Sequence, residues 1–296
     1  MQMGNVSNVP PEILDRIFMH CERNHSYRAL GPTYLPESRL QPLLLVCRKW
    51  HGIAERRLYA SVGLGSSRTV KDRKGRKIEI KGRDACERFS ETVQNNSRIA
   101  ALVRELRLGC MDGIEFRQSE SYVRLIGICK KVEKIELRGC HRGVLDDLFD
   151  ALKNSDLISV SLSHGSPEDG GKFGSMLTLV DLVSLLRSWP RIQKVYADFG
   201  DWDGPYGGDP LSEYPSAPGA CSSLKEFSIF GGQLSSTQLR HLADIAPNLE
   251  DILITVLLPI AKRLAQPQIT SRVSLDRKKK TVECLYLKKY ATLSHS

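Results

Sequence analysis

The feature that most constrains the fold is an apolar pattern, L-x-x-L-x-L, that recurs six times after residue 100. Its fourth and sixth positions lie on one face of an extended segment, because side chains alternate along a β-strand. Successive copies start 29, 25, 35, 32 and 25 residues apart. The copies are Val103/Leu106/Leu108, Val132/Ile135/Leu137, Leu157/Val160/Leu162, Ile192/Val195/Ala197, Leu224/Phe227/Ile229 and Leu249/Ile252/Ile254. The pattern indicates a short strand, buried on one face, that is repeated along the chain.

Amphipathic helical patterns lie between the copies, over residues 122–129, 144–152, 177–189 and 239–246. Two of them stop before Pro190 and Pro247, because the residue ahead of proline is pushed out of the helical region. The order strand, turn, helix, turn recurs at a period typical of leucine-rich repeats. A doubly wound α/β domain would need longer strands and a glycine-rich first turn. We predict an α/β fold, an irregular leucine-rich-repeat solenoid with a parallel sheet, with a candidate seventh copy at Val282/Leu285/Leu287.

Two amphipathic helices are predicted ahead of the repeats. The first, over residues 9–21, confines its prolines to the first turn, where a helix tolerates them. Its apolar stripe consists of Ile13, Leu14, Ile17, Phe18 and Cys21. The second, over residues 39–59, has a stripe of Leu43, Val46, Cys47, Trp50, Ile53, Ala54 and Leu58, and Ser38 with Gln41 has the spacing of a capping box. Two short helices of this kind bury little surface by themselves.

The two helices carry a family resemblance. Val9-Pro10-Pro11-Glu12-Ile13-Leu14, then Leu45-Val46-Cys47-Arg48-Lys49-Trp50 and Leu58-Tyr59, resemble the F-box. The resemblance implies that the helices dock on a Skp-type adaptor, and through it on a cullin, while the rest of the chain captures the protein to be ubiquitinated. The connection over residues 22–37 is longer than this motif usually carries.

The resemblance also implies which residues act at each place. The adaptor-binding surface would be formed or supported by Pro10, Ile13, Leu14, Ile17, Val46 and Trp50. Leu58 and Tyr59 would anchor the helices to the rest of the chain. The combination of an F-box with leucine-rich repeats is similar to that of fungal proteins that contain both parts.

The formal net charge of +9 raises the question of a nucleic-acid partner. The charge is concentrated in two tracts, net +6 over residues 65–83 and net +5 over residues 272–289. In the first tract, strand-like segments 68–70 and 78–80 predict a hairpin with Gly75 in its turn. We interpret it as a solvated hairpin tip, with a nuclear-import or phosphate-contacting patch as the alternative. No aromatic residues interleave with the charges to stack on bases, so nucleic acid is not expected.

Because the two basic tracts, the hairpin among them, lie outside the helical motif, we expect them to be dispensable for adaptor binding. No apolar window approaches the ~20 residues that cross a bilayer. The start of the chain also lacks the pattern of a signal peptide. We therefore expect no membrane contact, a location in the cytoplasm or nucleus, and reduced, mostly buried cysteines.

No constellation of residues predicts catalysis or metal binding. Residues 165–173 contain glycines as a phosphate loop does, but the glycine spacing is wrong and Phe173 replaces the magnesium-binding hydroxyl. Asp201-Trp202-Asp203 is interpreted as a turn. Cys140-His141 and His20-Cys21 lack a second Cys/His pair at ligand spacing. We expect no enzymatic activity, no cofactor and no metal, and expect Cys140 to bond backbone in a turn.

The target surface is predicted on the open face of the parallel sheet, where the residue between the last two apolar positions is displayed. That row reads Arg107, Glu136, Ser161, Tyr196, Ser228 and Leu253. Arg107 with Glu136, and Glu105 with Lys134, are expected to pair across strands. Further along, Tyr196, Phe230 and Leu253 expose apolar area with Asp198 at the rim. A loop over residues 200–223, with Trp202 and Tyr206, leaves the same strand end, and residues 165–175 form a second insertion. We predict that Tyr196, Asp198, Phe230 and Leu253 bind the target.

We expect three units: residues 1–62 as the helical F-box motif, 63–102 as basic hairpin and linking helix, and 103–296 as the solenoid. The chain is then the substrate-recognition subunit of a Skp-cullin-F-box ubiquitin ligase. The alternative is a non-catalytic leucine-rich-repeat binding protein, nuclear or nucleic-acid-associated, whose helical pair only caps the solenoid. A cap would cover the apolar stripe of the first helix, whereas an adaptor site leaves an exposed patch.

Overall fold

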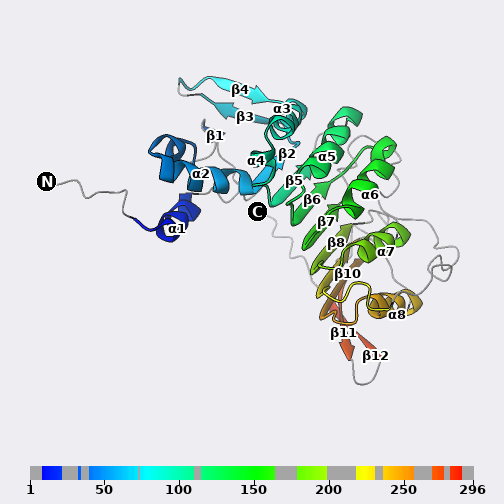
Figure 1. Cartoon of the computed structure of the whole chain (residues 1–296). Coiled ribbons are helices and arrows are strands. Elements are labelled where there is room, and N and C mark those ends of the chain that lie inside the picture. The colour runs from blue at the N-terminus through cyan, green and yellow to red at the C-terminus, as the bar shows by residue number, and fades with distance from the viewer. Residues whose placement is uncertain are drawn as a thin grey trace, which may run out of the picture.

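The computed structural model describes residues 9–21, 33–34, 40–72, 74–109, 115–163, 179–198, 218–230, 236–256, 269–276 and 281–288. It is a mixed α/β structure, with helices at the N-terminal end followed by a small sheet and a large, mostly parallel sheet (Figure 1). The large sheet extends away from the N-terminal helices. The two predicted insertions fall mainly on residues outside these ranges, Trp202 and Tyr206 among them.

Helix α1 spans Pro11–Cys21, as predicted, with proline at its first position. The amide N–H groups of Ile13 and Leu14 both donate to the carbonyl of Pro10 at 3.1 Å. These bonds satisfy donors that have no partner within the helix itself. The prolines therefore start the helix without interrupting it.

The prediction of one continuous second helix was wrong. The chain forms a 3-10 helix, η2 (Gln41–Leu45), and then an α-helix, α2 (Arg48–Ala60), separated by Val46 and Cys47. Pro42 occupies the first turn of η2, and Cys47 is fully extended (φ −163°, ψ 167°). The N-cap of η2 is Leu40, which makes no side-chain capping bond, and Ser38 lies outside the described residues.

Within the described residues nine strands form the large sheet, in the order β12-β11-β10-β9-β8-β7-β6-β5-β2. Strands β5 to β10 are mutually parallel, as predicted, and neighbours in sequence are neighbours in the sheet. Their bounds are β5 Glu105–Gly109, β6 Lys134–Arg138, β7 Ser159–Ser163, β8 Lys194–Asp198, β9 Glu226–Phe230 and β10 Asp251–Val256.

Within the described residues, helices follow β5, β6, β7 and β9 and lie together on one side of the large sheet (Figure 1). They are α5 Phe116–Ile128, α6 Leu145–Lys153, α7 Leu179–Ser188 and α8 Ser236–Ile245, with a 3-10 turn, η3 Arg142–Val144, ahead of α6. Helix α7 ends just before Trp189, which is fully buried, and its Nε1–H donates to the Leu152 carbonyl at 2.8 Å. The indole thus ties the ends of α6 and α7 together.

The apolar pattern of the six copies builds the core. All eighteen of its positions are buried. Equivalent positions are partners across neighbouring strands, Leu106 with Ile135 and Val195 with Phe227 among them. Register is thereby set by the apolar face, because a slip of one residue would turn every apolar side chain outward.

The turns ahead of the strands repeat as well. The carbonyl of Arg104 accepts hydrogen bonds from the amides of Glu133 and Lys134, at 2.8 and 3.0 Å. The carbonyls of Glu133, Ile158, Gln193 and Lys225 accept two amides from the next unit in the same way. Each strand–helix unit is therefore linked to the next by the same pair of backbone bonds, in addition to the strand ladder.

The two ends of the large sheet differ from the prediction. The candidate seventh copy at Val282/Leu285/Leu287 was wrong as a parallel repeat, because β12 (Thr281–Lys288) pairs antiparallel with β11 (Ile269–Asp276), and β11 antiparallel with β10. At the other end a strand that was not predicted, β2 (Ser61–Leu64), pairs parallel with β5. It comes directly after α2 without an intervening loop.

The predicted basic hairpin is confirmed. Strands β3 (Arg68–Lys71) and β4 (Lys77–Ile80) pair antiparallel, and Gly75 has a φ of 77°, which favours glycine. A third strand, β1 (Thr33–Tyr34), pairs parallel with β3. The long connection between the first two helices therefore contributes to this three-stranded sheet. Helices α3 (Gly82–Asn95) and α4 (Ser97–Ala100) come next and lead into β5.

Candidate binding surfaces

The helices α1, η2 and α2, here called the helical pair, have a small core of their own. It consists of Leu14, Phe18, Leu40, Ile53 and Ala54, with Trp50 packed against it. The rings of Phe18 and Trp50 meet edge to face, with centroids 5.2 Å apart. The apolar stripe of α1 therefore turns Leu14 and Phe18 toward α2.

An ion pair also joins α1 to α2. The Arg57 guanidinium donates to both carboxylate oxygens of Asp15, at 2.9 and 2.5 Å. These bonds, with the charges of Arg57 and Arg56, hold the pKa of Asp15 below its ordinary value. The carboxylate therefore stays ionised, and the pair fixes the crossing of the two helices.

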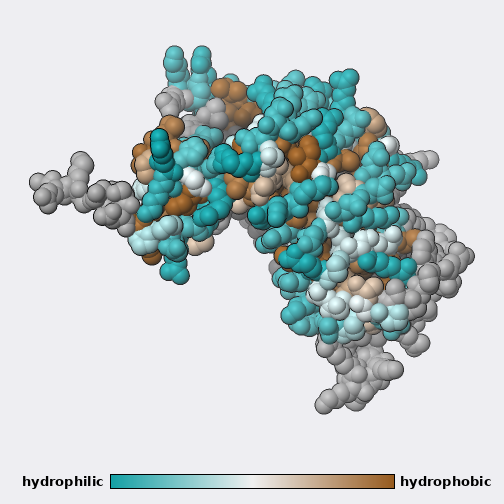
Figure 2. Space-filling model, in the orientation of Figure 1, coloured by the Kyte–Doolittle hydropathy of each residue, from teal (hydrophilic) through white to brown (hydrophobic). Residues whose placement is uncertain are grey.

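Several other apolar residues of the helical pair are uncovered. Ile17 exposes 48% and Leu45 88% of the surface they could expose. Ile13, Met19 and Val46 are exposed as well. We call Ile13, Ile17, Leu45 and Val46 the apolar patch, whereas Met19 lies on another side of α1 from Ile13 and Ile17. Figure 2 shows hydrophobic side chains at the surface of the helical pair. Exposed apolar side chains that lie side by side are typical of contact surfaces for other proteins, so this group is the candidate binding surface of the helical pair.

The six residues expected at the adaptor surface divide into two groups. Pro10, Ile13, Ile17 and Val46 are exposed, whereas Leu14 is buried and Trp50 is half-buried. Leu14 and Trp50 support the surface from beneath. Leu45 and Met19 were not predicted to be exposed. Leu45 lies at the end of η2, next to the break in the helix that was expected to be continuous.

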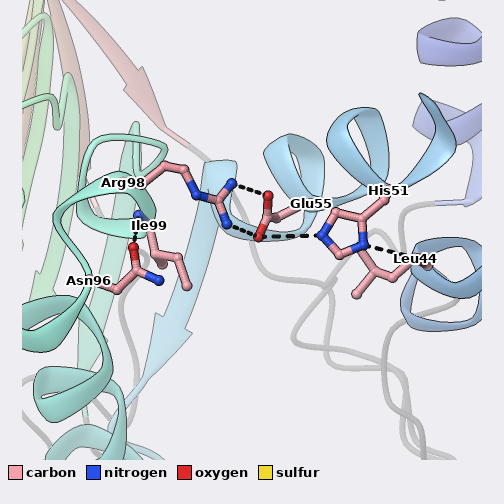
Figure 3. Close-up of polar contacts among 6 residues, drawn as sticks. All are labelled: Leu44, His51, Glu55, Asn96, Arg98 and Ile99. Carbon is pink, nitrogen blue, oxygen red and sulfur yellow. Dashed lines mark hydrogen bonds and ion pairs between the residues drawn. The ribbon is translucent and has the colours of Figure 1, made fainter. Parts of the chain in front are cut away.

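A polar chain fixes the helical pair to the rest of the molecule (Figure 3). The Arg98 guanidinium on α4 donates two hydrogen bonds to Glu55 on α2, one of them at 2.7 Å. The His51 ring lies between Glu55, 3.8 Å from its Nε2, and the Leu44 carbonyl, which accepts from Nδ1 at 3.0 Å. Glu55 is buried, and the Arg98 bonds lower its pKa. Glu55 thus joins α2 to α4, and the His51 ring beside it joins α2 to η2.

The backbone continues this connection into the large sheet. The amide of Arg104, just before β5, donates to the carbonyl of Ala60, the last residue of α2, at 3.0 Å. Tyr59 stacks on Phe89 of α3, with ring centroids 6.4 Å apart. Tyr59 therefore packs against the core of the large sheet, whereas Leu58, for which the same role was expected, packs against the core of the helical pair.

The second candidate surface lies on the open face of the large sheet. Tyr196, Ser228 and Leu253 are partners across β8, β9 and β10, and Asp198 is the partner of Phe230. Tyr196 and Leu253 expose 37% and 39% of their possible surface, while Phe230 and Asp198 are half-buried. Burial first, and the charge of Asp198 next, raise the pKa of the Tyr196 phenol, which stays neutral. The four predicted target-binding residues thus lie on three adjacent strands.

The expected cross-strand ion pairs at the other end of this face were wrong. Glu136 accepts from Arg138 on its own strand, with Nη2 at 2.7 Å, and Arg107 lies 3.7 Å from Glu105 on its own strand. Residues two apart on a strand share a face, so a long guanidinium reaches along the strand as readily as across it. A cross-strand pair that we did not predict joins Lys194 and Glu226 at 2.7 Å.

The Cys140-His141 dipeptide serves a turn. The His141 amide donates to Ser119 Oγ at 2.9 Å, and the His141 ring accepts from the amide of Gly143 at 3.1 Å, capping η3. Burial raises the pKa of the Cys140 thiol to about 11, with weaker opposite effects from Ser119 and the His141 backbone. Both side chains therefore belong to the connection between β6 and α6.

The described residues were also searched for groups of metal ligands and for helices that could cross a membrane. Among the described residues, no three His, Cys, Asp or Glu side chains are grouped so that they could hold a metal ion. None of the described helices has the length and apolar character needed to cross a bilayer. The phosphate-loop-like residues 165–173, and Asp201 with Asp203, lie outside the described ranges.

The N-terminal part of the chain matches a known family model. A family model described as F-box-like matches residues 6–64, which include α1, η2, α2 and β2. A search of curated proteins finds no match. The F-box resemblance of the two helices is therefore supported, and the match ends with β2, the edge strand of the large sheet.

Proposed function

We propose that this chain is the substrate-recognition subunit of a Skp-cullin-F-box ubiquitin ligase. F-box domains generally bind Skp-type adaptors, and the F-box-like match spans the whole helical pair. The observation that carries the proposal is the apolar patch, because Ile13, Ile17 and Leu45 stay uncovered although Leu14 and Phe18 are packed inside. A helical pair that only capped the sheet would have its stripe covered. The adaptor would in turn connect the chain to a cullin.

We further propose that residues 103–296 form a leucine-rich-repeat solenoid, with residues 1–62 as the F-box unit and 63–102 as the linking unit. The repeated double hydrogen bonds and the eighteen buried apolar positions support a stack of equivalent units. The open face would capture a target protein through Tyr196, Asp198, Phe230 and Leu253. The chain then acts as a scaffold without catalytic activity, in the cytoplasm or nucleus.

The adaptor site is tested with two exposed residues. Ile13→Asp together with Ile17→Asp places charges in the docking surface without touching the helical-pair core. Desolvating a charge costs several kcal/mol, so affinity for a purified Skp-type adaptor should fall about 100-fold or more. Leu14 is unsuitable for this test because it is buried.

The matched control replaces two similarly exposed apolar residues outside the patch, Phe116→Asp and Leu253→Asp. This variant should bind the adaptor as the unmodified chain does. Unchanged adaptor affinity in the Ile13/Ile17 variant, with its fold intact by circular dichroism, would refute the docking surface.

The target surface is tested separately. Tyr196→Ala with Phe230→Ala removes aromatic area from the open face and should lose captured proteins in proximity labelling, while adaptor binding persists. Retention of the same labelled proteins would place the target site elsewhere.

A further inference from the structure

The positive charge of this chain is concentrated around the helical pair. Residues 40–83 contain twelve Lys and Arg against three Asp and Glu, an excess equal to the formal net charge of +9 of the whole chain. This segment comprises η2, α2, β2 and the hairpin β3–β4. The remaining residues sum to zero, because the second basic tract, residues 272–289 with net +5, is offset by an excess of acids elsewhere.

The hairpin displays this charge to solvent. Lys74, Lys77 and Lys81 are exposed. One of its two acids, Asp72, is occupied by the turn itself: it accepts from the amides of Lys74 and Arg76 at 2.8 Å and from Arg76 Nε at 2.7 Å. These bonds lower the pKa of Asp72. They also make Arg76 part of the turn, whereas the exposed lysines lie in the turn (Lys74), at the start of β4 (Lys77) and just after β4 (Lys81).

The hairpin also offers features that fit a protein partner. Ile78 on β4 is 39% exposed, although its partner across the ladder, Val70, is fully buried. Within the described residues β4 forms the outer edge of its sheet. An exposed apolar residue on an edge strand suits protein contact. No aromatic residue is present between Arg68 and Lys81 to stack on bases.

The hairpin is held close to the helical pair by the chain itself. Tyr34 of β1 is the partner of Lys71 on β3. Six residues later, Leu40 lies in the core of the helical pair, and six residues span at most about 21 Å. Figure 1 shows the hairpin pointing away from the large sheet, toward the side of α1 and η2. A partner seated on the helical pair is therefore within reach of the hairpin.

We propose that the hairpin β3–β4 is a second docking element for the adaptor, facing an acidic surface next to the one that covers the apolar patch. This rests on the proposed function. The hairpin cations attract the acidic partner during approach, so they act on the association rate, while the apolar patch sets the dissociation rate. The expectation that the hairpin is dispensable rested on its distance from the motif in sequence, and the pairing of β1 with β3 removes that ground.

The test measures association and dissociation of the full chain with a purified Skp-type adaptor by stopped-flow or biolayer interferometry. The hairpin variant is Lys74→Gln, Lys77→Gln and Lys81→Gln, which leaves the Asp72–Arg76 turn intact. The control variant removes three exposed cations on the helical side of the large sheet, Arg124→Gln, Lys130→Gln and Lys131→Gln. Both variants lose the same net charge.

In about 50 mM salt the hairpin variant should associate about fivefold more slowly than the control, with dissociation rates equal within about twofold. At about 500 mM salt, where screening acts within a few ångström, the difference should disappear. Equal association rates for the two variants would overturn the inference while leaving the proposed function intact. No binding by the unmodified chain would refute the proposed function itself.

A nucleic-acid role is distinguished in the same series. A single-stranded oligonucleotide of about 20 nucleotides is titrated against both variants over the same salt range. Oligonucleotide binding that only the hairpin variant loses, together with unchanged adaptor kinetics, would overturn the proposal in favour of a nucleic-acid site. Oligonucleotide binding that is absent or equal in the two variants, with slowed adaptor association, supports the adaptor.

Discussion

Leu14 and Ile17 belong to the same predicted stripe of α1 but differ in their burial. Leu14 is buried against α2, whereas Ile17 is about half exposed. Their spacing predicts a shared face of the helix, but it does not say how wide a part of that face α2 covers. The sequence therefore placed both residues on one apolar stripe and could not tell the exposed residue from the buried one.

This difference predicts that truncating Leu14 destabilises the protein much more than truncating Ile17. Leu14→Ala should lower the free energy of unfolding by about 2–5 kcal/mol, because it leaves a cavity in a small core. Ile17→Ala should change the free energy of unfolding by less than about 0.5 kcal/mol, because about half of the side chain is already in contact with water. Urea denaturation of the two variants measures both values. Similar losses in the two variants would show that Ile17 is packed in solution.

Glu55 predicts a pH dependence of stability. Its pKa is lowered in the folded state by the Arg98 hydrogen bonds, so its contribution is complete above the unfolded value of about 4.3 and is lost as pH falls toward the folded value. Glu55→Gln should therefore cost about 1.5–3 kcal/mol at pH 7 and much less near pH 3. Urea denaturation of both proteins at the two pH values measures the difference. A cost that does not vary with pH would contradict the ionised pair.

At the scale of elements, the repeated strands and helices were the most predictable part of the chain. Each strand carries two alternating apolar residues, and the core selects their register. Three features depended on contacts that no local pattern encodes: the break at Val46 and Cys47, the strand β2, and the antiparallel pairing of β12. The ion pairs of Arg107 and Glu136 could not be predicted either, because each side chain could reach an opposite charge on its own strand or on the neighbouring strand.

The close approach of Gly82, at the start of α3, to Gly65, just after β2, gives a prediction about stability. A Cβ on Gly82 would lie 1.8 Å from the Gly65 carbonyl oxygen, so the backbones could not keep their approach. Gly82→Ala should lower the free energy of unfolding by about 2 kcal/mol or more. Gly127→Ala, in α5 with nothing within 4 Å of the new Cβ, should raise it by about 0.5–1 kcal/mol. Thermal denaturation separates the two, and a neutral Gly82→Ala would contradict this packing.

At the scale of the whole molecule, the helical pair and the large sheet are connected without a flexible linker. Helix α2 continues into β2, and the Glu55–Arg98 pair crosses the junction (Figures 1 and 3). The apolar patch and the open face therefore keep a fixed separation. The sequence could not show this, because residues 33–34 and 68–71, or 55 and 98, meet only through the tertiary fold.

The most direct test of the adaptor role is hydrogen exchange of the full chain with and without a Skp-type adaptor. Binding should slow exchange in peptides that cover α1 and the segment from Gln41 to Trp50, and leave peptides from β8, β9 and β10 unchanged. That result would place the adaptor on the helical pair and leave the open face for a target. Slowed exchange in β8 to β10, with no change in α1, would contradict the account.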